Sequence, residues 1–449
     1  MKKNFITFIL LSTILLTSCS TFVDLTEAQT SYYRGDYEST LNFLVLNYPQ
    51  IEKKQGTIVY HLDEGIVAHA GENFKTSNVS LLKAERAIEE NFTKSISANV
   101  GSFFLNESVR DYESAFYEDI YSNIFLSLNY YHLNNIEDAM VEVRRSLDKL
   151  QLREQNLPKL KAELENQLAD NNAKKINNKL SAFESSFDSS ALSYYLSSLF
   201  SFEFGDFDTF RISRDKGQAT SKLLAKYYLE DEYTAFDTLK NVTEDSTLVN
   251  FIAFSGLAPV KESKVDKNIL VIDQYVDDDG LYHKPYYTNV VYSVPKKRGS
   301  VVKSIEVKIG TKKYNLEAFE NLELIAFESL EQKCSGEYIR AYIRALSREI
   351  GKAATDTASV EEGATFVQSS MISDIFSIFS FVVEGSGDLR CSHFFPSKSW
   401  IGSFEIEPGK YDIVVSYLNS SKKIVFQEKF DDYNIKKGKA NLVEILSAK

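Results

Sequence analysis

The hexapeptide Asn134-Asn135-Ile136-Glu137-Asp138-Ala139 separates two stretches whose apolar residues recur at helical spacing. Asn134 can adopt the left-handed conformation that ends a helix, and Asn135 can cap the helix that follows. The same arrangement occurs at Gly35-Asp36 and at Gly205-Asp206, each time after aromatic residues. The sequence therefore predicts three helix-turn-helix units, in which an aromatic ring fills the notch between the two helices.

This turn resembles the one found in tetratricopeptide repeats. The middle copy fits the hydrophobic spacing of that repeat best, at Leu126, Tyr130, Ala139, Val143 and Ser146. The copies begin at residues 35, 134 and 205, much farther apart than one repeat of about 34 residues, so the array is irregular. We expect residues 19–255 to form a tetratricopeptide-like α-solenoid whose concave surface holds a peptide or a protein. A generic helical bundle is the alternative.

Residues 136–187 differ from the rest of this half, because apolar residues step by four and three between Lys, Glu, Asn and Gln. Such a stripe is typical of a coiled coil. We expect a long helical arm that is kinked or turned at Pro158, because proline cannot donate the backbone hydrogen bond of a helix interior. The stripe then either packs against the same chain or forms a seam for self-association.

The N-terminus has the layout of a bacterial signal peptide. Lys2 and Lys3 precede an apolar stretch at residues 5–16, which is too short to span a membrane. Leu16-Thr17-Ser18-Cys19 then resembles a lipobox, with a plain secreted protein as the alternative. The sequence predicts removal of residues 1–18 and attachment of acyl chains, such as palmitate, to Cys19. Ser20 resembles an outer-membrane sorting signal, so we expect a lipid-anchored outer-membrane protein that faces the periplasm.

Composition narrows the class of protein further. The 449 residues carry a formal net charge of −12, which disfavours binding to nucleic acid, since such a protein must offset phosphate charges. There are 26 Tyr and 31 Phe but only 1 Trp, so we expect a core rich in aromatic rings. With 3 Cys and 5 His, little material is left for a metal site, and neither a metal nor another cofactor is expected.

In the second half of the chain, the spacing of apolar residues changes from a helical period to the alternation typical of strands. Alternating β-branched and aromatic residues predict strands at 269–273, 286–294, 301–309, 313–316, 400–406, 411–417, 424–430 and 442–445. Helical spacing returns at 318–332, 337–356 and 371–383. We therefore expect residues 266–449 to form a β-sandwich-like domain with a helical insertion at 318–384. The whole chain is then an α+β multidomain protein.

Cys334 and Cys391 remain after lipidation of Cys19. In an oxidising compartment two cysteines often pair, which here would join the helical insertion to the sandwich. Sequence spacing cannot establish the geometry of a disulfide, so two buried free thiols are an equal alternative.

The sequence contains no catalytic motif that we could identify, so we expect the protein not to be an enzyme. His61, Glu64 and His69 lack the spacing of a zinc site. The acidic run at residues 277–280 lacks the alternating ligands of a calcium loop and is better interpreted as a charged turn between strands. Metal binding is therefore not expected at either place.

One row of charged side chains remains as a candidate interaction site. Arg340, Arg344 and Arg348 are spaced by four and would share one face of a helix. Such a row can meet a carboxylate or phosphate on a partner. The alternatives are a solvated face and a set of salt bridges within the chain.

Several short sequence segments between about residues 110 and 420 together resemble an uncharacterised family of bacterial envelope lipoproteins. They include Tyr117-Glu118-Asp119, Gly256-Leu-Ala-Pro259, Asp388-Leu-Arg390 and Glu407-Pro408-Gly409. The resemblance implies a tetratricopeptide-like N-terminal region and a β-rich C-terminal domain. Members of that family resemble neighbours of penicillin-binding-protein activator lipoproteins, which implies a role in envelope maintenance.

The sequence thus favours a lipid-anchored envelope protein that acts as an interaction scaffold or accessory factor. Its expected partners are the membrane, through the lipid, and a protein or peptide of the envelope. Two alternatives stay open. One is an envelope enzyme that acts on cell-wall material, which would need a polar cleft with paired carboxylates or a nucleophile and base. The other is a structural spacer whose arm at 136–187 bridges layers by its length.

Overall fold

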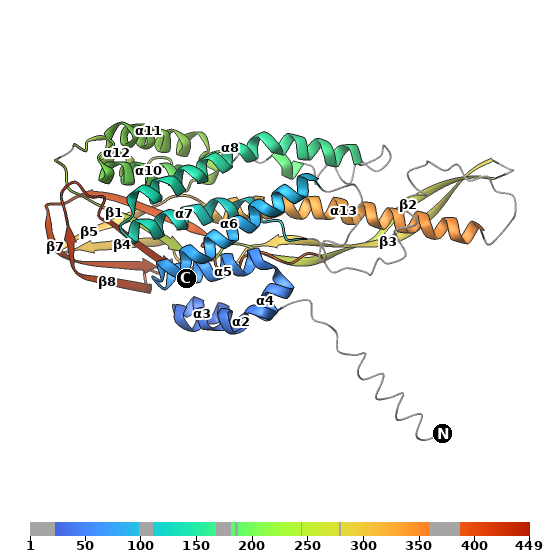
Figure 1. The fold of residues 1–449 in the computed structure, drawn as a ribbon, viewed down its shortest axis with the longest axis horizontal. Coiled ribbons are helices and arrows are strands. Elements are labelled where there is room, and N and C mark those ends of the chain that lie inside the picture. The colour runs from blue at the N-terminus through green and yellow to red at the C-terminus, as the bar shows by residue number, and fades with distance from the viewer. Residues whose placement is uncertain are drawn as a thin grey trace, which may run out of the picture.

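The computed structural model of the protein describes residues 23–97, 111–167, 181–184, 187–243, 245–277, 280–358 and 387–449. Within them the fold is mixed α/β, with eleven α-helices and a nearly closed β-sheet (Figure 1). The helices of the first half are α2 (Thr26–Arg34), α3 (Tyr37–Leu46), α4 (Tyr48–Gln55), α5 (Thr57–Ala70), α6 (Phe74–Ser97), α7 (Phe116–His132), α8 (Ile136–Gln167), α10 (Ala191–Phe204), α11 (Phe207–Leu223) and α12 (Thr234–Lys240). Short 3₁₀ helices occur at Ser181–Glu184 and Ala225–Tyr227.

All three predicted turns are confirmed. Gly35 and Gly205 end α2 and α10 with φ of 82° and 86°, and Asn134 follows α7 with φ of 59°. Asp36 and Asp206 then accept hydrogen bonds from backbone N–H groups three residues later, both at 3.0 Å. Each turn therefore joins two helices through the left-handed residue and the cap that the sequence indicated.

A fourth turn of the same kind was not predicted. It joins α5 to α6, and Glu72 takes the left-handed position with φ of 58°. Asn73 accepts a hydrogen bond from the N–H of Thr76 at 3.4 Å. This copy lacks the sequence signal of the other three, because its left-handed residue is Glu, whereas Gly and Asn are the usual residues there. The four helix pairs belong to a mixed α/β fold, and their description as a solenoid stays a prediction.

The capping carboxylates can be tested directly. We expect Asp206→Ala to lower the free energy of unfolding by about 1 kcal/mol, because it leaves a backbone N–H of α11 without its acceptor. Asp208→Ala, two residues later, is the matched control. Its side chain is exposed and pairs with exposed Arg211, so its effect should stay below about 0.5 kcal/mol. Urea denaturation measures both, and equal losses would contradict the capping role.

Seven strands form one sheet, whose order is β8-β7-β4-β5-β6-β1-β9. Its edge strands are β8 and β9, and β9 pairs parallel to β1 while the other pairs are antiparallel. The predicted β-sandwich is not confirmed, because the strands belong to a single sheet that nearly closes on itself. The strands are β1 (Leu248–Ser255), β4 (Ser304–Ile309), β5 (Lys312–Ala318), β6 (Lys398–Glu405), β7 (Gly409–Leu418), β8 (Ile424–Ile435) and β9 (Leu442–Ser447).

The helical and β-rich halves share one hydrophobic core. The predicted helical domain at 19–255 ends in β1, which lies between β6 and β9 inside the sheet, so this part of the prediction is wrong. β1 is buried along its whole length, and a strand buried on both faces has no polar alternation that would identify it. The same core cluster contains Leu44, Leu126 and Leu199 from helices and Ile252, Phe254 and Leu446 from strands.

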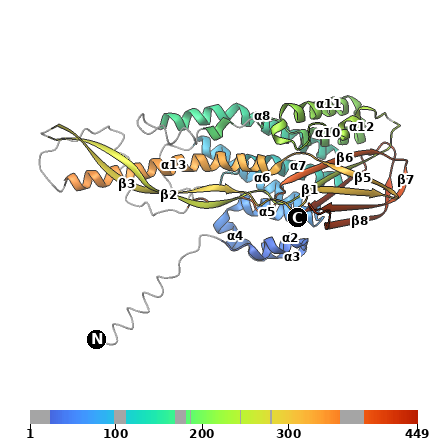
Figure 2. The same ribbon diagram turned by 180° about the vertical axis from the view of Figure 1, so that it is seen from behind.

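A long hairpin and a long helix extend away from the sheet. The hairpin consists of β2 (Val260–Asp277) and β3 (Gly280–Lys296), and α13 (Leu322–Ala358) runs beside it in both views (Figures 1 and 2). Asp277 at the end of β2 pairs with Gly280 at the start of β3, and residues 278–279 of the acidic run lie outside the described residues.

Within the predicted insertion, α13 is one continuous helix of 37 residues, whereas the sequence predicted two, at 318–332 and 337–356. The expected break at 333–336 is absent. Cys334 and Ser335 are buried there, and Ser293 of β3 donates a hydrogen bond to Cys334 at 3.2 Å. Tertiary packing thus overrides a locally polar stretch. The third predicted helix, at 371–383, lies outside the described residues.

The predicted arm at 136–187 begins as α8, which continues through Pro158 to Gln167. The chain therefore does not turn at the proline, although residues 168–180 lie outside the described range. Val143 and Leu150 of the apolar stripe belong to the main hydrophobic core of the same chain. Up to Leu157, which is also buried, the stripe packs within the chain rather than forming an exposed seam.

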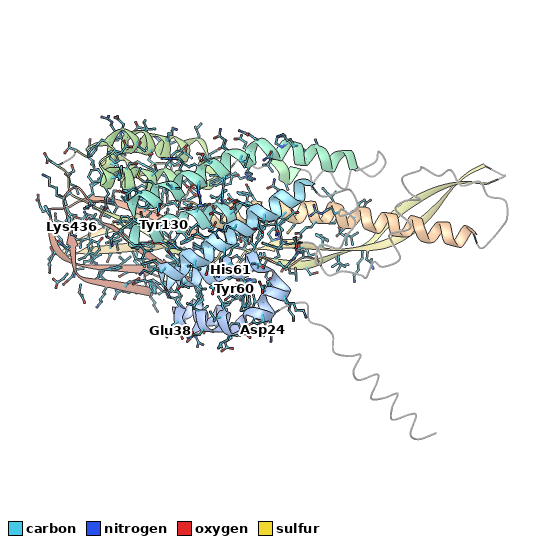
Figure 3. All side chains as sticks on the ribbon, viewed as in Figure 1. Asp24, Glu38, Tyr60, His61, Tyr130 and Lys436 are labelled. Carbon is cyan, nitrogen blue, oxygen red and sulfur yellow. The ribbon has the colours of Figure 1, made fainter. Side chains whose placement is uncertain are left out.

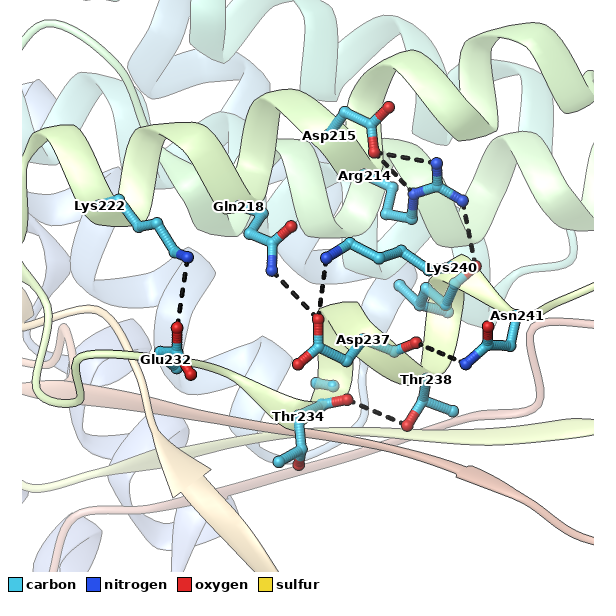
Figure 4. A network of polar contacts seen from close by, with 12 residues as sticks. Arg214, Asp215, Gln218, Lys222, Glu232, Thr234, Asp237, Thr238, Lys240 and Asn241 are labelled. Atoms are coloured by element: carbon cyan, nitrogen blue, oxygen red, sulfur yellow. Dashed lines mark hydrogen bonds and ion pairs between the residues drawn. The ribbon is translucent and has the colours of Figure 1, made fainter.

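Helices α11 and α12 contact each other through exposed polar side chains and through one closely packed aromatic ring. Asp237 of α12 accepts hydrogen bonds from Gln218 at 3.2 Å and from Lys240 at 2.9 Å (Figure 4). These groups are exposed, so each such pair contributes roughly 0–1 kcal/mol. The closer constraint is Gly217, where an added Cβ would lie 2.8 Å from the ring of Phe236. Phe236 is buried against Gly217, and this packing contributes more to holding α12 against α11 than the exposed polar pairs do.

Candidate functional site

The residues predicted from sequence do not converge on one site. Arg340 is half-buried on α13, and Arg344 and Arg348 follow on the same helix. The side chains of Arg344 and Arg348 lie outside what the structure describes, as does Cys19. The interaction surface predicted for this row stays a prediction.

Cys334 and Cys391 are both buried free thiols in the structure. Burial raises the pKa of Cys334 to about 11 and that of Cys391 to about 12. Each thiol is therefore protonated at neutral pH and a poor nucleophile. The disulfide stays a prediction that a thiol assay can decide.

We expect neither cysteine to react with a thiol-specific reagent at pH 8 in the folded protein, because both are buried and protonated. In denaturant and without reductant, a Cys19→Ser variant should show two reactive thiols. If the denatured chain shows none until it is reduced, the two cysteines are paired and the free-thiol description is wrong. A Cys19→Ser/Cys334→Ser double variant, which should show one thiol, controls for the count.

His61 and His69, considered together in the sequence, have separate partners. His61 lies beside Tyr60 on α5, and its Nδ1 is 3.2 Å from Glu64 (Figure 3). His69 is directed to other elements, as described below. No group of three or more His, Cys, Asp or Glu side chains that could hold a metal ion occurs among the described residues.

A cavity of about 600 Å³ lies between the edge strands β8 and β9 and the turns of the helix pairs. Glu72 and Asn134 of two turns line it. So do Tyr37, which begins α3 directly after the turn at Gly35-Asp36, and Glu203, which lies in α10 just before the turn at Gly205-Asp206. In both views the C-terminus, which follows β9, lies beside α2, α3 and α5 (Figures 1 and 2). The repeated turn found in the sequence therefore marks the wall of one pocket. We call this cavity the turn pocket.

The inner wall of the turn pocket contains a buried carboxylate held by two histidines. Glu444 of β9 accepts from Nε2 of His69 at 2.7 Å and from Nε2 of His132 at 2.8 Å. Nδ1 of His69 lies 2.6 Å from Oδ1 of Asn129. The ring of Phe74 stacks on that of His132 at 4.5 Å. These contacts join α5, α6 and α7 to the edge strand β9.

Tyrosine hydroxyls satisfy much of the free edge of β9. Tyr131 accepts a hydrogen bond from the N–H of Leu442 at 3.0 Å, and Tyr433 donates to its carbonyl oxygen at 3.4 Å. Tyr37 donates to the carbonyl oxygen of Leu446 at 2.9 Å. Because an edge strand otherwise exposes unpaired backbone groups, these hydroxyls hold the strand without another strand beside it. The same three aromatic rings line the turn pocket.

The charges on the inner wall stabilise one another. Burial alone would raise the pKa of Glu444, but His69 and His132 lower it to about 2. Burial alone would lower the pKa of His69, but the charge of Glu444, its hydrogen bonds and the more distant Glu72 raise it. Glu444 is therefore ionised at neutral pH, and its charge favours the protonated form of His69.

These shifts predict how stability depends on pH. A His whose pKa is raised by folding stabilises the protein fully below its unfolded pKa, and this contribution is lost as pH rises through the folded pKa. The contribution of Glu444 is present above its unfolded pKa and is lost as pH falls towards about 2. We expect the free energy of unfolding, measured in urea, to fall from pH 6.5 to pH 9.

The matched variants for this prediction are Glu444→Gln and His61→Gln. Removing the Glu444 charge leaves burial as the main influence on His69, so the part of the slope due to His69 should vanish or reverse. His61→Gln removes the other histidine of α5, which pairs with Glu64, and leaves the His69–Glu444 contact in place, so it tests whether the slope belongs to that contact. An unchanged slope in Glu444→Gln would show that another group causes the dependence.

The remaining carboxylates of the turn pocket carry an unbalanced negative charge. The carboxylate of Glu203 already has partners, since it accepts hydrogen bonds from Lys439 at 3.2 Å and from the N–H of Ala440 at 3.0 Å. Glu72 and Glu428 form no hydrogen bond or ion pair through their side chains with any residue that the structure describes. Burial and the nearby charge of Glu72 raise the pKa of Glu428. None of the residues that line the turn pocket is Lys or Arg.

The turn pocket could not be recognised as a site from the sequence, although three of the four turns around it could. Its residues come from α3, α5, α6, α7, α10, β8 and β9, so no single spacing brings them together.

Comparisons with family models, with curated proteins and with solved structures found no match to this chain. In the part of the chain that the structure describes, no helix has the length and apolar character needed to cross a membrane.

Proposed function

We propose that this chain is a lipid-anchored envelope protein that acts as an interaction scaffold or accessory factor and binds a partner protein at the turn pocket. The observation that carries the proposal is the convergence of four helix turns on the gap between the two edge strands of the sheet. A pocket of about 600 Å³ falls in the size range of ligand sites. It is large enough for one or two side chains of a partner.

The location follows from the lipobox at residues 16–19, with Cys19 as the acylated residue. Two or more acyl chains are enough for stable anchoring, and a net charge of −12 disfavours attachment through anionic lipid headgroups. We propose the outer membrane, with the body of the protein in the periplasm and a role in envelope maintenance. The helix pairs then serve as a short tetratricopeptide-like array in which the turns, rather than a concave face, meet the partner.

In-cell crosslinking tests this function. A photoreactive benzophenone amino acid replaces Phe430, which lines the turn pocket, and in a second variant it replaces Ile212, which is exposed on α11 outside it. Illumination of intact cells should crosslink a discrete protein at position 430 and not at position 212. No adduct at position 430, in cells that express the protein at its normal level, would contradict a partner at this site.

One observation favours a second candidate, an enzyme that acts on cell-wall material. Glu72 and Glu428 are acidic neighbours, and burial raises the pKa of Glu428. Such pairs serve as acid and base in glycoside hydrolysis. Incubation of purified cell wall with the protein decides this, since release of soluble fragments that is lost in Glu428→Gln would favour the enzyme.

A further inference from the structure

We propose that the turn pocket holds a cationic side chain, lysine or arginine, of the partner protein, between the carboxylates of Glu72 and Glu428 and the aromatic rings around them. This inference rests on the proposed function, and it names the chemistry that the partner must present. Four features carry it: two carboxylates without a cation, the lining charge, the aromatic walls and the size of the cavity.

The first feature is the pair of carboxylates. Glu72 extends from the turn between α5 and α6, and Glu428 extends from the edge strand β8, so two separate parts of the fold bring like charges to one cavity. Neither is compensated by a hydrogen bond or an ion pair within the described part of the chain. Like charges in a partly enclosed space repel each other, and a cation between them would remove that cost.

The second feature is the balance of charge over the whole lining. His69 and His132 both pair with Glu444. Lys439 lies outside the lining and forms an ion pair with Glu203. Since no Lys or Arg is present among the lining residues, Glu72 and Glu428 leave the pocket with negative charge. A carboxylate or phosphate group of a partner would therefore be repelled, whereas an ammonium or guanidinium group would be attracted.

The third feature is the aromatic wall. Tyr37, Phe426, Phe430 and Tyr433 line the same cavity. Tyr37 and Tyr433 are already held through their hydroxyls on β9, so their rings need little ordering when a ligand enters. A cation over such a ring gains about 0.5–2 kcal/mol, and the apolar stem of lysine or arginine packs on it.

The fourth feature is size. A cavity of about 600 Å³ holds a long side chain and part of the backbone on either side of it, but not a folded domain. The occupant is therefore a basic residue in an extended segment or loop of the partner. A free small amine would leave most of the aromatic wall uncovered.

Calorimetry on the full chain in nonionic detergent tests this inference. The probes are acetylated, amidated five-residue peptides with one central residue between pairs of glycines. That residue is lysine, arginine, norleucine or glutamate, and butylamine is the small-amine probe. We expect the lysine and arginine peptides to bind at least tenfold more tightly than the norleucine and glutamate peptides and than butylamine, and binding should weaken as salt is raised.

The matched variants are Glu428→Gln, Glu72→Gln and Glu38→Gln. Glu428→Gln should weaken binding of the lysine peptide at least tenfold, and Glu72→Gln should weaken it at least threefold. Glu38 is an exposed carboxylate on α3 outside the pocket, so Glu38→Gln should leave this binding unchanged. The inference is overturned if the norleucine peptide binds equally well, if no peptide binds, if butylamine matches the peptides, or if Glu428→Gln has no effect.

The two proposals can fail separately. If position 430 crosslinks a partner in cells and that adduct is unchanged by Glu72→Gln and Glu428→Gln, the partner site stands and the cationic occupant is wrong. If the lysine peptide binds as expected but no partner is crosslinked, the pocket chemistry stands and the scaffold function is wrong.

Discussion

Replacing Lys261 by Met should lower the free energy of unfolding by about 3–5 kcal/mol, one of the two largest effects that we expect. The ammonium group of Lys261 is fully buried, 2.8 Å from Glu337 and 3.0 Å from the carbonyl oxygen of Asp388. Glu337 is itself only 3% exposed. The variant therefore leaves a buried carboxylate without its cation, which costs much more than the ion pair contributes.

Lys296→Met is the control for Lys261→Met. Lys296 lies on β3 and pairs with Glu262 at 3.3 Å, but 61% of its side chain is exposed, so we expect a loss of at most about 1 kcal/mol. The double variant Lys261→Met/Glu337→Gln should recover part of the loss, because it removes the unpaired charge. Urea denaturation measures all three. Similar losses for Lys261 and Lys296 would contradict the role of burial.

The second large effect is expected at Glu320, whose carboxylate is completely buried at the start of α13. It accepts hydrogen bonds from the hydroxyls of Tyr121 at 2.5 Å, Ser190 at 3.0 and 3.1 Å and Tyr228 at 3.2 Å. It also accepts from the N–H of Leu192 in the first turn of α10, at 3.0 Å. We expect Glu320→Ala to cost about 3–5 kcal/mol, because it leaves several buried donors without an acceptor.

Glu320→Gln tests whether the charge or the acceptor matters. Glutamine keeps one oxygen acceptor, so the loss should be smaller, about 1–3 kcal/mol. Glu306→Ala is the surface control, since Glu306 pairs with exposed Lys313 and should change stability by less than about 1 kcal/mol. If Glu320→Ala unfolds at the same urea concentration as Glu306→Ala, the buried network contributes little and the prediction is wrong.

Both residues show why the two predicted domains are one packed body. Glu320 follows β5, yet its donors come from α7, α10 and the segment after α11. Lys261 begins the hairpin, yet its partners lie on α13 and ahead of β6. The boundary drawn near residue 255 follows the change in hydrophobic period, which reports local conformation and carries no information on how much surface two segments bury together.

The turn pocket shows the same limit in functional terms. Gly35, Asn134 and Gly205 could be recognised as helix ends, because the left-handed conformation and the cap depend on residues only a few positions apart. The turn at Glu72 was missed because its left-handed residue is an unusual one. That all four turns face the gap between β8 and β9 depends on how the sheet curves, which the alternation within single strands does not specify.

The sequence by itself determined the local features of this protein. These are the capped helix pairs, the acidic connection between β2 and β3, most strands of the sheet, and the lipobox prediction at Cys19. Only the tertiary structure decided the inclusion of β1 in the sheet, the near closure of the sheet, the single helix α13 and the turn pocket. The physical reason is distance along the chain. Caps and turns involve groups within about four residues, whereas His69 reaches Glu444 only because burial of a shared core draws segments hundreds of residues apart into contact.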